Sequence, residues 1–201
     1  MIIGPRYKKA RYLGASLFKK TQTDKYAARA QRKAKNVGGR GGKSEYGKQM
    51  LEKQKARYSY GVSSGQFGKY VKKSLESSGN SSSLLIQKLE GRLDNVVFRS
   101  GFCLSRSQAR QMVSHGHLLV NGKRVTIPSL EVKVGDIITV RKGSENKKIF
   151  ENIAENVKNS IIPAWIKVDI DTKTIKIDGI PSRQESELLF DMGQVLEFYT
   201  R

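Results

Sequence analysis

The stretch that decides the fold is residues 105–125, which read SRSQARQMVSHGHLLVNGKRV. Its first four residues fit a capping box, with serine at the helix cap and glutamine three residues later. A short helix is therefore predicted over residues 105–116, and its inner face holds Ala109, Met112 and Val113. Residues 118–120 and 123–125 flank Asn121-Gly122, a dipeptide that suits a tight two-residue turn. The stretch predicts a helix that leads into a β-hairpin.

Helices are predicted on the amino-terminal side of this stretch. Ser44 can cap a helix that runs to Gly61, and a polar connector over residues 77–83 separates the next two. Gly101 stops the last of them in the manner of a glycine C-cap. Apolar residues at helical spacing place these helices at residues 44–60, 67–75 and 84–100. Residues 1–43 are predicted to be an arm with little regular structure.

Strands are predicted on the carboxy-terminal side, because apolar and polar residues alternate there. The predicted strands are residues 137–140, 165–169, 174–177 and 195–199, and residues 142–159 form a polar helical connector. Helices followed by strands indicate an α+β fold, with a helical N-terminal domain, a small helix-helix-hairpin module and C-terminal antiparallel strands. The predicted domains are a basic arm (1–43), a helical domain (44–90), the module (91–155) and C-terminal strands that pack on the rest (156–201).

The charge of the chain points to a polyanionic partner. Its 38 Lys and Arg residues against 18 Asp and Glu residues give a net charge of +20, and residues 1–57 hold 17 cations and 3 acids. Such an excess repels itself unless a polyanion neutralises it, and a basic arm of this kind is typical of nucleic-acid binding. An anionic membrane surface is disfavoured, because the arm has few large apolar residues and contains Gly39, Gly41 and Gly42. No apolar run or signal block is present, so we expect a soluble, intracellular protein.

The residues that carry enzyme or metal chemistry are sparse. His115 and His117 lie around a helix-ending glycine without further ligands, and Cys103 is the only cysteine, so neither a zinc site nor an internal disulfide is expected. Residues 91–94 (Gly-Arg-Leu-Asp) look like the catalytic aspartate motif of one group of RNA pseudouridine synthases. The hundred or so residues beyond them are too few for that catalytic domain. We expect no catalytic residue, metal or cofactor.

A cationic ledge is predicted on the helix and hairpin instead. Arg106 and Arg110 lie four residues apart on one helix face, and the hairpin brings Asn121, Lys123 and Arg124 toward the same surface. Cations on a rigid apolar support suit contacts to phosphate and sugar groups. In this interpretation Arg92 faces RNA, Leu93 packs inward, and Asp94 orients a neighbouring cation or caps a backbone group.

These residues resemble a known family. The runs Gly91 to Asp94, Ser105-Arg106, Ala109 to Gln111, Val113 to His117 and Val120 to Lys123 resemble the RNA-binding module named after small-subunit ribosomal protein number four. The runs Ser44 to Gln49, Glu52 to Lys55, Tyr60 to Val62 and Gln66-Phe67 resemble the helical region of that family, and Val195 to Tyr199 its last strand. The chain lacks the cysteine cluster of some members and so resembles the zinc-free type. Residues 37–43 also lack the family's usual Gly-x-His-Gly pattern.

The resemblance implies a structural, non-enzymatic protein of the small ribosomal subunit. It implies primary binding of small-subunit ribosomal RNA (rRNA) at a multi-helix junction, which nucleates assembly. It also implies a contact with ribosomal protein number five, a place at the channel where messenger RNA (mRNA) enters, and an influence on decoding accuracy. The expected location is the ribosome, in the cytoplasm or alternatively in an organelle matrix or stroma. An RNA-modifying enzyme and a general DNA-coating protein are the alternatives.

The residues predicted to bind rRNA combine the arm, the helical region and the module. They are Arg6, Lys8, Lys9, Arg11, Arg40, Lys43, Tyr46, Lys48, Lys53, Lys55, Arg57, Lys69, Arg92, Arg106, Arg110, Gln111, Ser114, His115, Asn121, Lys123 and Arg124.

Overall fold

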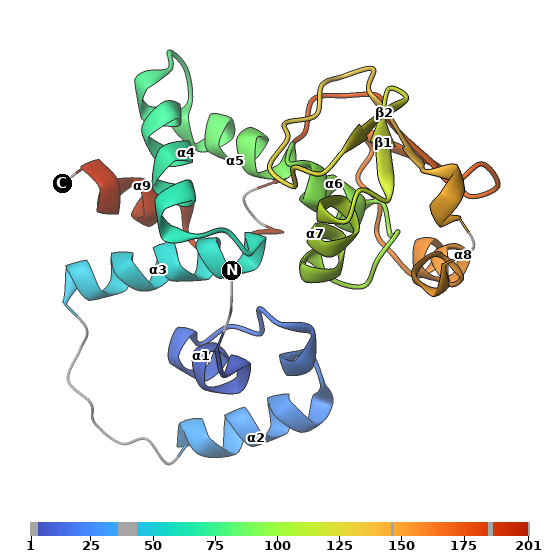
Figure 1. Cartoon of the computed structure of the whole chain (residues 1–201). Coiled ribbons are helices and arrows are strands. Elements are labelled where there is room, and N and C mark those ends of the chain that lie inside the picture. The colour runs from blue at the N-terminus through green and yellow to red at the C-terminus, as the bar shows by residue number, and fades with distance from the viewer. Residues whose placement is uncertain (1–3, 36–43, 146, 185–186, 201) are drawn as a thin grey trace. The chain divides into compact units, whose positions relative to one another are not determined.

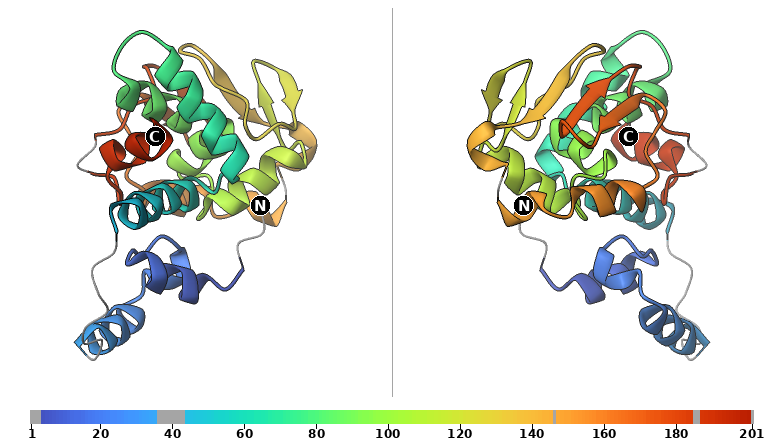
Figure 2. Two further views of the ribbon diagram at one scale, coloured as in Figure 1. Left: turned by 90° about the vertical axis from the view of Figure 1, so that its left-hand side faces the viewer. Right: turned by 90° about the vertical axis from the view of Figure 1, so that its right-hand side faces the viewer.

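The protein folds into two compact units. A computed structural model describes residues 4–35, 44–145, 147–184 and 187–200. Unit 1 combines Met1–Ser82 with Gln184–Arg201, and unit 2 is Ser83–Arg183. In the described residues unit 1 is helical, whereas unit 2 contains helices and an antiparallel sheet, as Figures 1 and 2 show. This confirms the α+β fold class.

Unit 1 is built around two helices that the sequence predicts. Its elements are α1 (Arg6–Leu13), η1 (Lys19–Thr21), α2 (Asp24–Lys35), α3 (Glu45–Tyr60), α4 (Ser64–Glu76) and α9 (Met192–Thr200). The Ser44 hydroxyl caps α3 by accepting a hydrogen bond from the Gly47 amide at 3.3 Å, and Gly61 ends the helix. Ser63 caps α4 in the same way. The core of unit 1 includes Leu51, Ala56, Tyr60, Phe67, Val71 and Val195.

The end of the chain is a helix, and the strand predicted over residues 195–199 is wrong. Asp191 caps α9, because its carboxylate accepts a hydrogen bond from the Gln194 amide at 3.1 Å. The helix packs along α3, where the Gln49 amide donates to the Glu197 carboxylate at 3.0 Å. The alternation of apolar and polar residues over residues 195–199 is also compatible with a helix. When Met192 is included, Met192, Val195, Leu196 and Tyr199 have the spacing of one helical face.

The amino-terminal arm also has more regular structure than predicted. Residues 4–35 contain α1, η1 and α2. Only Ala10 and Leu13 of α1 are buried, so the helix has too few apolar residues for its period to show in the sequence. Phe18 is buried and meets the ring of Tyr58 on α3 edge-on, with the ring centres 6.2 Å apart. One aromatic residue of the arm therefore anchors it to its own fold.

Unit 2 places helices against one face of a five-stranded sheet. Its elements are α5 (Ser81–Glu90), α6 (Leu93–Arg99), α7 (Arg106–Ser114), β1 (Leu118–Val120), β2 (Lys123–Val125), β3 (Ile137–Val140), η2 (Lys142–Ser144), η3 (Lys148–Phe150), α8 (Ile153–Lys158), β4 (Ile166–Asp169) and β5 (Thr174–Ile177). The strand order is β2-β1-β3-β5-β4, and all neighbours are antiparallel. Ile138 on β3 pairs with Val120 and Ile175, and together with residues of α6, α7 and α8 they form the core.

The predicted hairpin and the strands up to residue 177 are confirmed. The turn between β1 and β2 is Asn121-Gly122, with positive φ at both residues, which the tight hairpin turn requires. The sheet, however, joins strands from both sides of the domain boundary predicted at residues 155 and 156, because β3 pairs with β5. The residues of α9 belong to unit 1. The predicted C-terminal domain of strands (156–201) is therefore divided between the two units.

The helix predicted over residues 84–100 is two helices. Arg92 lies between α5 and α6 in an extended conformation and forms a β-bridge with Glu131. The amide of Leu93 donates to the Leu130 carbonyl at 2.8 Å. At the break this backbone amide is therefore satisfied by a residue distant in sequence instead of by its own helix. The break turns the start of α6 toward α7.

Candidate nucleic-acid interface

The predicted cations of the arm are largely exposed. Arg6, Lys8 and Arg11 on α1 are exposed, and Lys9 is half-buried. Arg40 and Lys43, together with the glycine-rich run around them, lie outside the described residues.

Lys9 and Arg57 form a cationic pair around an aromatic ring. The Lys9 Nζ lies 4.8 Å from the centre of the Tyr58 ring, and the Arg57 guanidinium lies 4.5 Å from it. Burial raises the pKa of Tyr58, but the hydrogen bonds and charges of Lys9 and Arg57 outweigh it, so that the pKa is lowered. The cations of α1 and α3 therefore meet on one surface of unit 1.

The second aromatic cluster of unit 1 holds another predicted cation. The Lys53 Nζ lies 4.1 Å from the centre of the Phe198 ring and 5.4 Å from that of Tyr199. Burial, and then the charge of Arg57, lower the pKa of Lys53. Tyr46 is exposed and its ring lies 5.4 Å from that of Phe198, centre to centre. Tyr46 therefore presents exposed aromatic surface to the solvent, as stacking on a base requires.

The remaining predicted cations of unit 1 differ in how they are held. Lys48 and Glu45 form an exposed ion pair at 3.3 Å, whereas Lys55 and Glu52 form a less exposed pair at 2.6 Å. Lys69 on α4 is exposed. An exposed pair contributes little to stability, so Lys48 can exchange its carboxylate for a phosphate at small cost.

In unit 2 the helix that decides the fold forms as predicted. The Ser105 hydroxyl accepts a hydrogen bond from the Gln108 amide at 3.3 Å and caps α7. The Gln108 side chain reaches back, but to the amide of Leu104 rather than to that of the capping serine. The inner face buries Ala109, Met112 and Val113.

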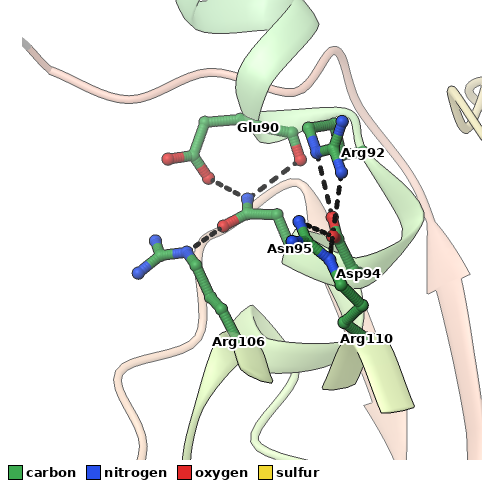
Figure 3. Close-up of polar contacts among 6 residues, drawn as sticks. All are labelled: Glu90, Arg92, Asp94, Asn95, Arg106 and Arg110. Atoms are coloured by element: carbon green, nitrogen blue, oxygen red, sulfur yellow. Dashed lines mark hydrogen bonds and ion pairs between the residues drawn. The ribbon is translucent and has the colours of Figure 1, made fainter. Parts of the chain in front are cut away.

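The two arginines of the predicted ledge are anchored from behind by α6 (Figure 3). The Arg106 Nε donates to the Asn95 side-chain oxygen at 2.7 Å, and its guanidinium lies 4.4 Å from the centre of the Phe98 ring. Arg110 donates from Nε and Nη2 to one carboxylate oxygen of Asp94, at 3.0 and 2.7 Å. The ledge is present, and Asn95 and Asp94 on α6 hold the guanidinium groups of Arg106 and Arg110 in place.

Arg92 is placed differently from the prediction that it faces RNA. Its side chain is buried, and it forms a two-point ion pair with Asp94 at 3.0 and 2.9 Å. Asp94 is itself 1% exposed and thus joins Arg92 to Arg110. The prediction that Asp94 orients a neighbouring cation agrees with this geometry. Arg92 is an internal partner, because the break before α6 turns it inward.

Glu90 is a second buried carboxylate, and the sequence did not single it out. It accepts two hydrogen bonds from Arg99, at 3.1 and 3.0 Å, and one from the Asn95 amide at 2.7 Å. Arg183 lies 3.9 Å from it. Glu90 and Arg99 belong to different helices, so the spacing of residues within one helix does not predict their ion pair. Arg183 comes from a distant part of the chain. Asn95 thereby links Glu90 to Arg106.

The hairpin brings its arginine to the end of α7, as predicted. The Arg124 Nη2 donates to the His115 carbonyl at 3.4 Å. Asn121 is held at the turn, because its amide donates to Asp136 at 2.8 Å and its oxygen accepts from the Ile137 amide. The polar residues predicted for this surface are all exposed, namely Gln111, Ser114, His115, Asn121, Lys123 and Arg124. The structure thus brings the predicted residues of α7 and the hairpin together.

His117 is buried beside this surface, which gives a testable pH dependence. Its Nδ1 lies 3.0 Å from the Ser144 hydroxyl, and burial, followed by the charges of Lys147, His115, Arg141 and Arg124, lowers its pKa from 6.5. As the pH falls, the unfolded chain binds this proton before the folded protein does, so stability is lost below about pH 6.5.

Replacing His117 by asparagine is expected to reduce the fall in the free energy of unfolding between about pH 7 and about pH 5. Asparagine keeps a hydrogen-bonding group near Ser144 but does not titrate. Urea denaturation at several pH values measures the slope. An unchanged slope in His117→Asn would show that His117 does not contribute.

Features of other functions do not gather in the described residues. No group of three or more histidine, cysteine or acidic side chains could hold a metal ion there. Burial raises the pKa of the Cys103 thiol to about 12, which makes it a poor nucleophile. None of the helices that the structure describes has both the length and the apolar character needed to cross a membrane.

Two family models match adjoining parts of the chain. Residues 1–90 match the model of the ribosomal protein S4/S9 N-terminal domain, and residues 91–138 match that of the S4 domain. The two matches adjoin at the helix break before α6. They cover the arm, α3 and α4 on one side and the anchored ledge with its hairpin on the other.

Relatives align over nearly the whole chain. The small ribosomal subunit protein uS4B of Clostridium acetobutylicum is 43% identical over 99% of this chain and 97% of that protein. The small ribosomal subunit protein uS4 of Heliobacterium modesticaldum is 38% identical over 98% of both chains. The uS4 of Sulfurihydrogenibium sp. is 43% identical over 78% of both. These alignments, with the two domain matches, show that the chain belongs to the uS4 family of structural, non-enzymatic ribosomal proteins.

Proposed function

We propose that this chain is a constituent of the small ribosomal subunit that binds the rRNA of that subunit. The observation that carries the proposal is the inward placement of two carboxylates. Glu90 and Asp94 are 0% and 1% exposed, and they hold arginines from inside the fold. The acids therefore stabilise the basic surface from within without presenting negative charge to RNA.

The arrangement favours recognition of a folded RNA by shape. Hydrogen bonds and ion pairs fix Arg106 and Arg110 on α7, and Arg124 is held at the end of the same helix. Cations at fixed positions match the irregular phosphate spacing of an RNA junction better than that of a plain duplex. In unit 1, Tyr46 adds a stacking surface beside cations.

The family resemblance supports a more specific form of the proposal. The protein binds early at a multi-helix junction in the 5′ part of the small-subunit rRNA and nucleates assembly. It contacts ribosomal protein number five, lies at the channel where mRNA enters, and influences decoding accuracy. It acts in the ribosome, in the bacterial cytoplasm or in an organelle matrix or stroma.

Binding to a transcript of the 5′ part of small-subunit rRNA is expected to exceed binding to duplex DNA of equal length by at least about tenfold. The logarithm of the binding constant should fall linearly with the logarithm of salt concentration, by about 0.9 per phosphate neutralised on a duplex and about 0.7 on a single strand. Filter binding with both polyanions in the same salt measures both quantities.

The competition separates the proposal from a general DNA-coating function. Both functions predict salt dependence, because both neutralise phosphates. Only a shape-selective RNA binder discriminates between the two polyanions. Equal affinities across the salt series would overturn the proposed function and favour the coating protein.

A further inference from the structure

A second basic surface in unit 2 lies outside the residues that the sequence predicts to bind rRNA. Residues 141–148 read RKGSENKK and contain four cations and one acid. They follow β3 and form η2 and the start of η3. They also lie beyond residues 91–138, which the S4 domain model covers. We call Arg141, Lys142, Lys147 and Lys148 the 141–148 cations.

The segment is fixed to the fold through His117. The Arg141 amide donates to the His117 carbonyl at 2.9 Å, and the His117 ring contacts the Ser144 hydroxyl. The same ring meets the Phe150 ring edge-on, with centres 6.2 Å apart. These contacts hold the start and the middle of the segment, and Phe150 just after it, against His117, which follows α7.

Charges from separate parts of unit 2 converge at this point. Burial lowers the pKa of His117 most, and the charges of Lys147, His115, Arg141 and Arg124 lower it further. No ion pair joins any of the 141–148 cations, or Arg124, to an acid in the described part of the chain. The cations of α6 and α7, by contrast, have Glu90 and Asp94 behind them. Cations that have no acidic partner repel each other, and a bound anion would reduce this repulsion.

One polar atom of the segment also lacks a partner. The Arg141 Nε is buried and makes no hydrogen bond. The described residues therefore leave this donor unsatisfied.

We propose that the 141–148 cations, with Arg124, form a second binding surface for the phosphate backbone of RNA, which extends the ledge on α7. The inference rests on the proposed function and names a further part of its interface. Lys142, Lys147 and Lys148 are exposed, and Phe150, which follows the segment, is buried. The surface therefore contacts phosphates rather than stacking on bases, and its contribution does not depend on base sequence.

The test replaces Lys142, Lys147 and Lys148 by glutamine in the full chain. All three side chains are exposed, so the fold is expected to persist with an unchanged melting temperature. With one phosphate lost per lysine, the salt slope for the rRNA transcript should become shallower by roughly two to three units. Affinity at low salt should fall at least about tenfold.

A matched variant controls for net charge. Lys133, Lys167 and Lys176 are exposed lysines of the same unit, two of which pair with Asp178. Their replacement by glutamine removes the same charge and is expected to leave the salt slope within about half a unit of wild type. Hydroxyl-radical footprinting of the RNA should show one protected stretch that only the first variant loses.

The outcomes separate the two proposals. If wild-type protein does not prefer the rRNA transcript, the proposed function fails, and the inference fails with it. If wild type binds but the two variants have equal slopes and footprints, the second surface is overturned while the proposed function stands.

Discussion

Replacing Asp94 by alanine is expected to lower the free energy of unfolding of unit 2 by about 3–5 kcal/mol. Asp94 and Arg92 are both almost fully buried and joined by two hydrogen bonds, so alanine leaves a guanidinium inside the protein without its carboxylate. Arg110 loses its anchor at the same time. Urea denaturation followed by fluorescence of Trp165, the single tryptophan and a residue of unit 2, measures the change.

Two further variants define the cause. Asp94→Asn keeps the shape and one acceptor but removes the charge, so its loss should be smaller than that of alanine. Asp171 is an exposed acid of the same unit, and Asp171→Ala should stay within about 0.5 kcal/mol of wild type. If Asp94→Ala is as stable as Asp171→Ala, Arg92 is not held as the structure shows.

Replacing Gly101 by alanine is expected to cost about 3 kcal/mol in the same measurement. Gly101 has φ +80°, which disfavours any residue with a Cβ, and an added Cβ would lie 2.9 Å from the Val157 Cα. That neighbour is backbone of α8, which cannot rotate away as a side chain can. The variant must therefore displace α8 from the core.

Gly135 is a control position that distinguishes the cost of a positive φ from the cost of a steric clash with α8. It also has a positive φ, +91°, but an added Cβ there would have no neighbour within 4 Å. Gly135→Ala should therefore show only the conformational cost, about 1–2 kcal/mol. Equal losses at the two positions would mean that α8 does not pack closely on Gly101.

The sequence predicts best the parts of the fold that local chemistry decides. The caps at Ser44 and Ser105 and the turn at Asn121-Gly122 act within a few residues, and all three form as predicted. The end of the chain was mispredicted because its identity depends on α3, 140 or so residues away, which supplies the surface for α9. Alternation over five residues cannot decide between a strand and a helix when the partner is unknown.

The site follows the same division. The sequence identifies Arg106, Arg110 and Arg124, because a helix face and a hairpin place them together. It does not reveal that Arg92 points inward. That placement depends on the helix break before α6 and on the hydrogen bond from the Leu93 amide to the Leu130 carbonyl. Nor does it show that Arg141 lies beside His117, because that contact follows from the pairing of β1 with β3.

Unit 1 is discontinuous in the sequence, so its parts are synthesised at different times. Helix α3 is synthesised before unit 2, whereas α9, which packs along α3, is synthesised after unit 2. Unit 2 is contiguous and can fold while the tail is still being added. In the nascent chain Phe67 therefore lacks its contact with Tyr199 until α9 has been synthesised, and a truncation before Met192 would remove that contact.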